Sequence, residues 1–164
     1  MSHSDIFGDF YKLRTLKLSD FNDIYSNLHS SKSIMNRIGL SQLSYKDSYL
    51  MSLNMYLNKN IYCWIVSDIN DTFYGIVTVH KHCDFYTINI ILKPSACGKN
   101  IASQAVRMAI FNFEPHSKFY AICKTYNERG INFFTKLGFK YAYTDKFISV
   151  YEVKVKWYQC IKRH

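Results

Sequence analysis

The chain has 164 residues, 48% apolar and 20% charged, which excludes a disordered chain and is typical of a single globular domain, here expected to span residues 1–164. The N-terminus lacks the basic start and apolar stretch of a signal peptide, and no apolar run approaches the ~20 residues of a membrane span, so the cytoplasm is the expected location and no membrane partner is expected. The five cysteines form no CxxC pair, so no disulfide framework and no metal site is expected, while the net charge of +9 favours an anionic partner.

Alternation of apolar residues and β-branched or aromatic enrichment predict the strands, in chain order, at 11–18, 61–66, 73–80, 85–92, 119–125, 140–144 and 149–157. Helical spacing and capping residues predict the helices at 21–28, 45–57, 101–113 and 128–137. Residues 29–43 are predicted to form a loop or a broken helix. Ser19 and Asp20 are expected to cap the first helix. The segment strand–loop–helix–strand over 85–125 predicts a crossover that places two strands parallel in one sheet.

The most informative segment is Ile-Ile-Leu-Lys-Pro-Ser-Ala-Cys-Gly-Lys-Asn-Ile-Ala, residues 90–102. A strand passes through a loop with Gly98 into a helix, which directs several backbone N–H groups and a helix N-terminus toward one point. Such a point binds anions, and Lys99 adds positive charge. Many strand–turn–helix junctions contain glycine without binding an anion, so both interpretations stay open at this stage.

A second segment, residues 127–139, contains a helix that Asn127 caps and that Gly138 ends before a strand. A well-terminated helix requires no function, so this segment alone indicates only structure.

Together the two segments resemble the GNAT superfamily of N-acetyltransferases. The family pattern Pro-x-x-Gln/Arg-Gly-x-Gly-x-Gly/Ala is matched by Pro94, Cys97, Gly98, Lys99, Asn100, Ile101 and Ala102. The later pattern is matched by Asn127, Gly130, Phe134, Lys136, Gly138 and Phe139. The opening segment YKLRTLKLSDFNDIY is also similar to the start of the family's domain. Within the superfamily, the pattern most resembles the ribosomal-protein N-terminal acetyltransferase group.

This resemblance implies a mixed α+β fold with a splayed sheet of six to seven strands, flanked by about four helices. It also implies acetyl-CoA, bound between the strands 85–92 and 119–125. The implied cofactor-binding residues are Ile91, Leu92, Cys97, Gly98, Lys99, Asn100, Ile101, Ala102, Asn127 and Phe134. Asn100 stands where the family has glycine, and asparagine is the residue that best tolerates a left-handed backbone after glycine. Cys97 replaces a glutamine or arginine, which leaves the backbone N–H contacts in place.

The chemistry that the resemblance implies is direct attack of a neutral amine on the thioester carbonyl. The catalytic candidates are Asn127, Asn89 and His82. His82 lies with His80 and Asp84 at the turn before the strand 85–92, where a histidine could relay a proton, although the simpler interpretation of each is a solvated turn residue. Phe134 occupies the position where relatives often carry a proton-donating tyrosine, and Tyr126 and Tyr141 are near it in the sequence.

The predicted function is therefore transfer of acetyl to a primary amine, either a protein N-terminus or a small molecule such as a nucleotide-linked amino sugar. Two alternatives stay open: a catalytically silent GNAT-fold module that binds CoA or a partner, and an acetyltransferase acting on aminoacyl-tRNA. The excess of 21 basic over 12 acidic residues predicts poor binding of polyamines and leaves nucleic acid open as a partner. The sequence does not distinguish a monomer from a homodimer.

Overall fold

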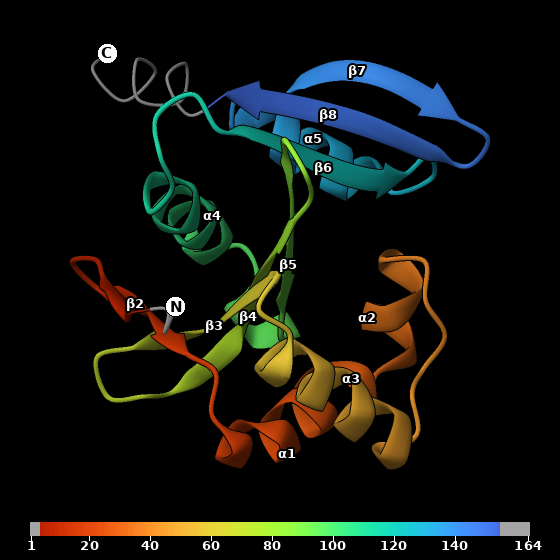
Figure 1. Cartoon of the computed structure of the whole chain (residues 1–164). Coiled ribbons are helices and arrows are strands. Elements are labelled where there is room, and N and C mark those ends of the chain that lie inside the picture. Colours follow the sequence, from red (N-terminus) through yellow and green to blue (C-terminus); the bar gives the residue numbers. More distant parts are fainter. Residues whose placement is uncertain (1–3, 155–164) are drawn as a thin grey trace.

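A computed structural model describes residues 4–154, in which one eight-stranded sheet has the order β1-β2-β3-β4-β5-β6-β8-β7 (Figure 1). The strands are β1 (Ile6–Phe7), β2 (Tyr11–Thr15), β3 (Ile61–Asp68), β4 (Phe73–Lys81), β5 (Tyr86–Leu92), β6 (Lys118–Lys124), β7 (Lys140–Asp145) and β8 (Ile148–Lys154). The helices are α1 (Phe21–Ile24), α2 (Lys32–Arg37), α3 (Tyr45–Leu57), α4 (Ile101–Phe111) and α5 (Glu128–Lys136). All neighbouring strands are antiparallel except β5 and β6, which are parallel.

The mixed α+β architecture predicted from the sequence is confirmed, with eight strands where six to seven were expected. The additional strand, β1, is only two residues long and pairs with β2, so its sequence carries no periodicity. The predicted last strand, 149–157, is observed over Ile148–Lys154, and residues 155–157 lie outside the described part of the chain.

The segment 29–43 contains a fifth helix, α2, which the sequence left as a loop or a broken helix. The Ser31 hydroxyl accepts the Ile34 N–H at 3.4 Å, and Ile34 and Met35 are buried. Six residues are too few to present a helical repeat, so this cap and two core contacts define a helix that periodicity does not detect. The preceding helix, α1, continues as a π-helical turn over Tyr25–His29.

Two hydrophobic cores lie on opposite faces of the sheet. One contains Trp64, Ile88 and Phe119 together with residues of α4 and α5, and the other contains Ile65 and Ile91 together with residues of α1, α2 and α3. In Figure 1 the helices α1, α2 and α3 group together, apart from α4 and α5. Since neighbouring residues of a strand point to opposite faces, the strands β3, β4 and β5 contribute to both cores.

Cys63 and Cys123 are buried thiols. Burial raises the pKa of Cys63 to about 12 and that of Cys123 to about 11. Both sulfurs are therefore protonated at neutral pH and serve as core residues and not as nucleophiles.

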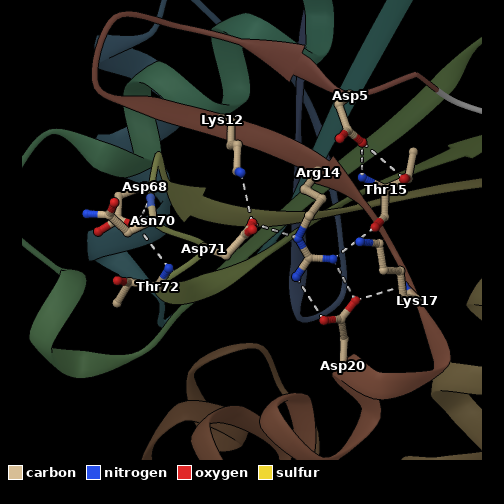
Figure 2. Close-up of polar contacts among 10 residues, drawn as sticks. All are labelled: Asp5, Lys12, Arg14, Thr15, Lys17, Asp20, Asp68, Asn70, Asp71 and Thr72. Carbon is tan, nitrogen blue, oxygen red and sulfur yellow. Dashed lines mark hydrogen bonds and ion pairs between the residues drawn. The ribbon is translucent and has the colours of Figure 1, made fainter.

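A cluster of charged side chains holds β2 against the turn that leads into α1 (Figure 2). The Arg14 guanidinium donates to both carboxylate oxygens of Asp20, at 2.9 and 2.8 Å, and its Nε donates to Asp71 Oδ1 at 3.2 Å. Lys12 Nζ lies 2.9 Å from the same oxygen of Asp71. Arg14 and Asp20 are 8% and 5% exposed, and their hydrogen bond raises the pKa of Arg14.

This cluster corrects two predictions. Asp20 does not cap α1 with its side chain; its carboxylate instead accepts the Lys17 N–H at 2.7 Å in addition to Arg14. The strand ends at Thr15 instead of Leu18, because a 3-10 turn over Leu18–Asp20 follows it. The turn between β3 and β4, which carries Asp71, is thereby tied to β2.

The parallel pair β5–β6 is short. Only Tyr86 and Thr87 of β5 are in register with Phe119 and Tyr120 of β6. Beyond these residues β5 continues with β4, while β6 continues with β8 over its whole length. The two strands therefore separate from Ile88 onward, and a gap opens in the middle of the sheet.

Candidate functional site

A cavity of about 750 Å³ occupies the gap between β5 and β6. Its lining comes from β5, the end of β6, the loop and first turn of α4, the start of α5, and the end of α2. Because these elements belong to both cores, the cavity extends from one face of the sheet to the other through the gap.

The edge of β5 presents backbone groups to this cavity. The Lys93 N–H donates to the Tyr74 carbonyl and the His82 N–H to the Phe85 carbonyl, both at 2.9 Å. Bonded and non-bonded pairs alternate in an antiparallel ladder, so the N–H groups of Ile90 and Leu92 point away from β4. They point toward the gap, at a level where β6 is no longer in register with β5. Residues 87–92 all line the cavity.

The loop after β5 joins a helix N-terminus at one end of the cavity. Gly98 has φ +77°, and a Cβ built on it meets nothing within 4 Å, so the backbone there is open to a ligand. Asn100 is in the left-handed region, with φ 59° and ψ 8°, and makes no side-chain cap bond to α4. The sequence predicted that an asparagine at this position tolerates such a left-handed backbone, and this prediction is confirmed. The first N–H groups of α4 have no partner within the helix and face the cavity at residues 101–103.

Most of the predicted cofactor-binding residues line this cavity: Ile91, Leu92, Cys97, Gly98, Asn100, Ile101, Ala102, Asn127 and Phe134. Lys99 is exposed and is not part of the lining. Its contribution is therefore limited to the charge of the surroundings. The Cys97 side chain is half-buried, and its Sγ lies 3.6 Å from the Lys93 carbonyl oxygen.

Asn127 begins α5 beside the cavity. Its Oδ1 accepts the Gly130 N–H at 3.0 Å, so it caps the helix as predicted. A Cβ on Gly130 would lie 2.6 Å from Asn127 Nδ2, which explains why the chain has glycine there. Phe134 is buried, with its ring centroid 5.0 Å from that of Phe133 and 5.1 Å from that of Phe139. This end of the cavity is therefore bounded by an amide and by aromatic rings.

Two of the three predicted catalytic residues, Asn89 and His82, lie on the face of the sheet opposite to Asn127. Asn89 and His80 both line the cavity, and Asn89 Oδ1 accepts the Ile90 N–H at 2.9 Å. His82 does not line the cavity; it is exposed, its Nε2 lies 3.2 Å from Thr87 Oγ1, and its ring stacks on Phe85. The sequence places three titratable residues, His80, His82 and Asp84, at this turn without showing which one enters the cavity. The register of β4 against β5 pairs His80 with Thr87, and His80 lines the cavity.

The pKa of His80 is lowered, first by burial and second by the neighbouring charge of His82. The His80 imidazole is therefore neutral at neutral pH and able to accept a proton.

Tyr120 and Glu152 form a further polar pair near the point where β5 and β6 separate. Tyr120 is in register with Thr87 on one side and with Glu152 on the other. A hydrogen bond to the Glu152 carboxylate, together with burial, raises the pKa of Tyr120. The sequence alone does not reveal this pair, because its residues are 32 positions apart and only the strand register brings them together.

The charged residues that line the cavity are all basic among residues 4–154: Arg37, Lys124 and Arg129, in addition to the titratable His80. Within the same described range, no group of three or more His, Cys, Asp or Glu side chains is arranged to hold a metal ion.

The sequence matches the model of the Acetyltransferase (GNAT) domain over residues 11–140. The chain therefore belongs to the GNAT acetyltransferase family and is an acetyl-CoA-dependent acetyltransferase by class, which confirms the fold and the enzyme class expected from the sequence. A search of curated protein sequences finds no match.

Three solved structures are similar over nearly their whole length. The GNAT-family acetyltransferase of Bacillus anthracis has a TM-score of 0.79 at 16% identity, covering 93% of this chain and 99% of that one. An acetyltransferase of Thermus thermophilus has a TM-score of 0.78 at 15% identity, covering 88% and 96%. The spermidine N-acetyltransferase of Vibrio cholerae, solved with CoA and spermine, has a TM-score of 0.78 at 18% identity, covering 91% and 98%.

At these identities the likeness establishes the fold, and the comparisons do not reach the ribosomal-protein subgroup that the sequence favoured. None of the helices within residues 4–154 has the length and apolar character needed to cross a membrane.

Proposed function

We propose that this protein transfers the acetyl group of acetyl-CoA to a primary amine. The observation that carries the proposal is the cavity, which joins an open helix N-terminus on one face of the sheet to polar side chains on the other. A ligand that fills it can bind by one end and present its other end to a second substrate across the sheet.

The residues present fit an extended, phosphate-bearing ligand. Gly98 leaves its surroundings open, and the uncapped N-terminus of α4 favours negative charge. Arg129 adds a cation at the start of α5. The edge of β5 at Ile90 and Leu92 offers backbone groups to an amide-containing arm, and Asn127 offers its side-chain amide. Acetyl-CoA, when bound, supplies an acyl thioester that an amine can attack.

His80 is proposed as the proton acceptor for the attacking amine. It lines the cavity, it is half-buried, and its lowered pKa keeps it neutral at neutral pH. Asn89 is proposed to orient the amine, because its side chain is exposed on the same face. When Asn89 turns toward the acceptor it releases the Ile90 N–H, which then becomes available to an oxygen that gains negative charge.

None of the acids that the sequence suggested for the leaving thiolate lines the cavity within residues 4–154. Phe134 cannot donate a proton, and neither Tyr126 nor Tyr141 lines the cavity. The Tyr126 hydroxyl donates to the Asn36 carbonyl at 3.4 Å, and the Tyr141 hydroxyl donates to Thr144 at 3.1 Å. The sulfur is therefore proposed to leave as the thiolate.

Protein N-termini, as in the ribosomal-protein group, and small amines such as nucleotide-linked amino sugars are the proposed acceptors. The aminoacyl-tRNA alternative rests on the net charge of +9 alone, and a silent CoA-binding module is the outcome that would replace the proposal.

Release of free CoA from acetyl-CoA, followed with a thiol reagent in the presence of a primary-amine panel, tests the proposal. Amine-dependent thiol release supports it. Binding of CoA by calorimetry without thiol release on any amine would assign the silent role instead.

A further inference from the structure

The three cations of the cavity divide between the two faces of the sheet. In β6, Phe119, Ala121 and Cys123 belong to the core beneath α4 and α5. Because strand residues alternate, Lys124 points to the opposite face, which α1, α2 and α3 cover.

Arg37 lies in the last turn of α2. Ile34 of the same helix belongs to the core formed with α1, α2 and α3, so Arg37 lies on the same face of the sheet as Lys124. Arg129 in contrast begins α5, on the face of the proposed phosphate site.

Contacts between α2 and β6 hold Arg37 and Lys124 near each other. A Cβ on Gly39, two residues after Arg37, would overlap the stem of the Lys124 side chain, so that stem lies against the Gly39 backbone. The Tyr126 hydroxyl also reaches the Asn36 carbonyl at 3.4 Å. The end of α2 is thereby joined to the end of β6 across the cavity.

Neither cation is neutralised within the described part of the chain. The ion pairs found among residues 4–154 involve only Lys12 and Arg14 with Asp20 and Asp71. No aspartate or glutamate of the same range lines the cavity. Two cations that line a cavity with no carboxylate favour an anionic ligand group and disfavour a polycation.

We propose that the acceptor is a primary amine that also carries a carboxylate or a phosphate, and that Arg37 and Lys124 bind this anionic group. This inference rests on the proposed function, because it names the substrate class of the same site. Lys124 is four residues beyond Tyr120 on β6, about 13 Å along the strand from the point where β5 and β6 separate. The anion and the amine of the acceptor are therefore separated by several bonds, unlike those of a simple α-amino acid.

Matched pairs of acceptors test the anion while the amine stays the same. Triglycine is compared with its C-terminal amide, and glucosamine 6-phosphate with glucosamine, so that the two arms distinguish a carboxylate from a phosphate. Both binding to the CoA-saturated protein, by calorimetry, and turnover, by thiol release, are measured at low and at physiological salt.

The anionic member of at least one pair is expected to bind about 10-fold more tightly and to be turned over with a correspondingly higher kcat/KM. The preference is expected to fall to 2-fold or less in Arg37→Gln and in Lys124→Gln. Lys32→Gln is the matched control, since it removes the same charge from the exposed start of the same helix and leaves the cavity unchanged. Thermal melting of each variant verifies that it folds.

Equal binding of both members of each pair overturns the inference, and so does a preference for the anionic member that survives both substitutions. This holds even if turnover of glucosamine shows that the protein is an active acetyltransferase. Preference for spermidine over every anionic amine overturns it as well. If the anionic members bind preferentially but no amine releases thiol, the anion site stands and the proposed function fails.

Discussion

The charged cluster of β2 and the gap between β5 and β6 differ in how their polar groups are satisfied. At β2, Arg14 and Asp20 are buried and form a bidentate ion pair, and Asp71 and Lys12 complete the cluster. At the gap, the β5 edge, the α4 N-terminus and the basic side chains face a cavity. The first arrangement fixes the fold, and the second is left for a ligand to complete. Substitutions in the charged cluster should therefore change stability, and substitutions at the gap should change catalysis or ligand binding.

The largest expected effect is on stability, at the charged cluster. Asp20→Ala leaves the Arg14 guanidinium buried without its main partner, which costs about 3–5 kcal/mol of unfolding free energy. Urea denaturation measures the loss. Asp23→Ala, an exposed residue of α1, is the matched control and should change stability by less than about 0.5 kcal/mol. Equal stability of the two variants would show that the cluster does not hold β2.

At the gap, the largest effect is expected on catalysis. His80→Gln should lower kcat/KM by about 100-fold, the usual contribution of a general base, with little change in stability. The wild-type kcat/KM, expressed per neutral amine, should be level above pH 7 and fall as the pH decreases through the His80 pKa, which lies below its ordinary value of 6.5.

His82→Gln is the control, and it distinguishes His80 from the histidine that the sequence favoured. Removing the nearby charge of His82 raises the His80 pKa, so the acidic limb of the pH profile should move to higher pH. A 100-fold loss in His82→Gln with normal activity in His80→Gln would return the role to His82.

Cofactor affinity should depend on Gly98. Gly98→Val places a branched side chain at φ +77° and fills the open space at the α4 N-terminus, so acetyl-CoA should bind at least ~10-fold more weakly by calorimetry. Lys99→Gln, at the adjacent exposed position, should bind nearly as the wild type does. Unchanged affinity in Gly98→Val would place the cofactor elsewhere.

The smallest effect is expected at Asn100. Asn100→Gly relieves the left-handed strain at φ 59° and should be neutral or stabilising by up to ~1 kcal/mol in urea denaturation. A clear loss of acetyl-CoA affinity with an intact fold would show instead that the Asn100 side chain contacts the cofactor.

The sequence predicts local features well, because their causes are local. Gly98, Asn100 and the Asn127 cap act through their own backbone or through residues three positions away. The sequence does not show strand register, so it does not show which residues of different strands lie together at the site. His80 enters the cavity through its pairing with β5, and Tyr120 meets Glu152 only across β6 and β8. Arg37 was missed because α2 is too short to show a helical period.

Hydrogen exchange with and without CoA tests most directly whether the gap is the cofactor site. The two regions compared above are expected to respond differently. Added CoA should slow exchange at the amides of Leu92, of Gly98 and of residues 100–103, which line the cavity. It should leave residues 11–20 unchanged, since their polar groups are already bonded within the chain. Protection spread evenly over both regions, or absent from residues 92, 98 and 100–103 under saturating CoA, would contradict the placement of acetyl-CoA between β5 and β6.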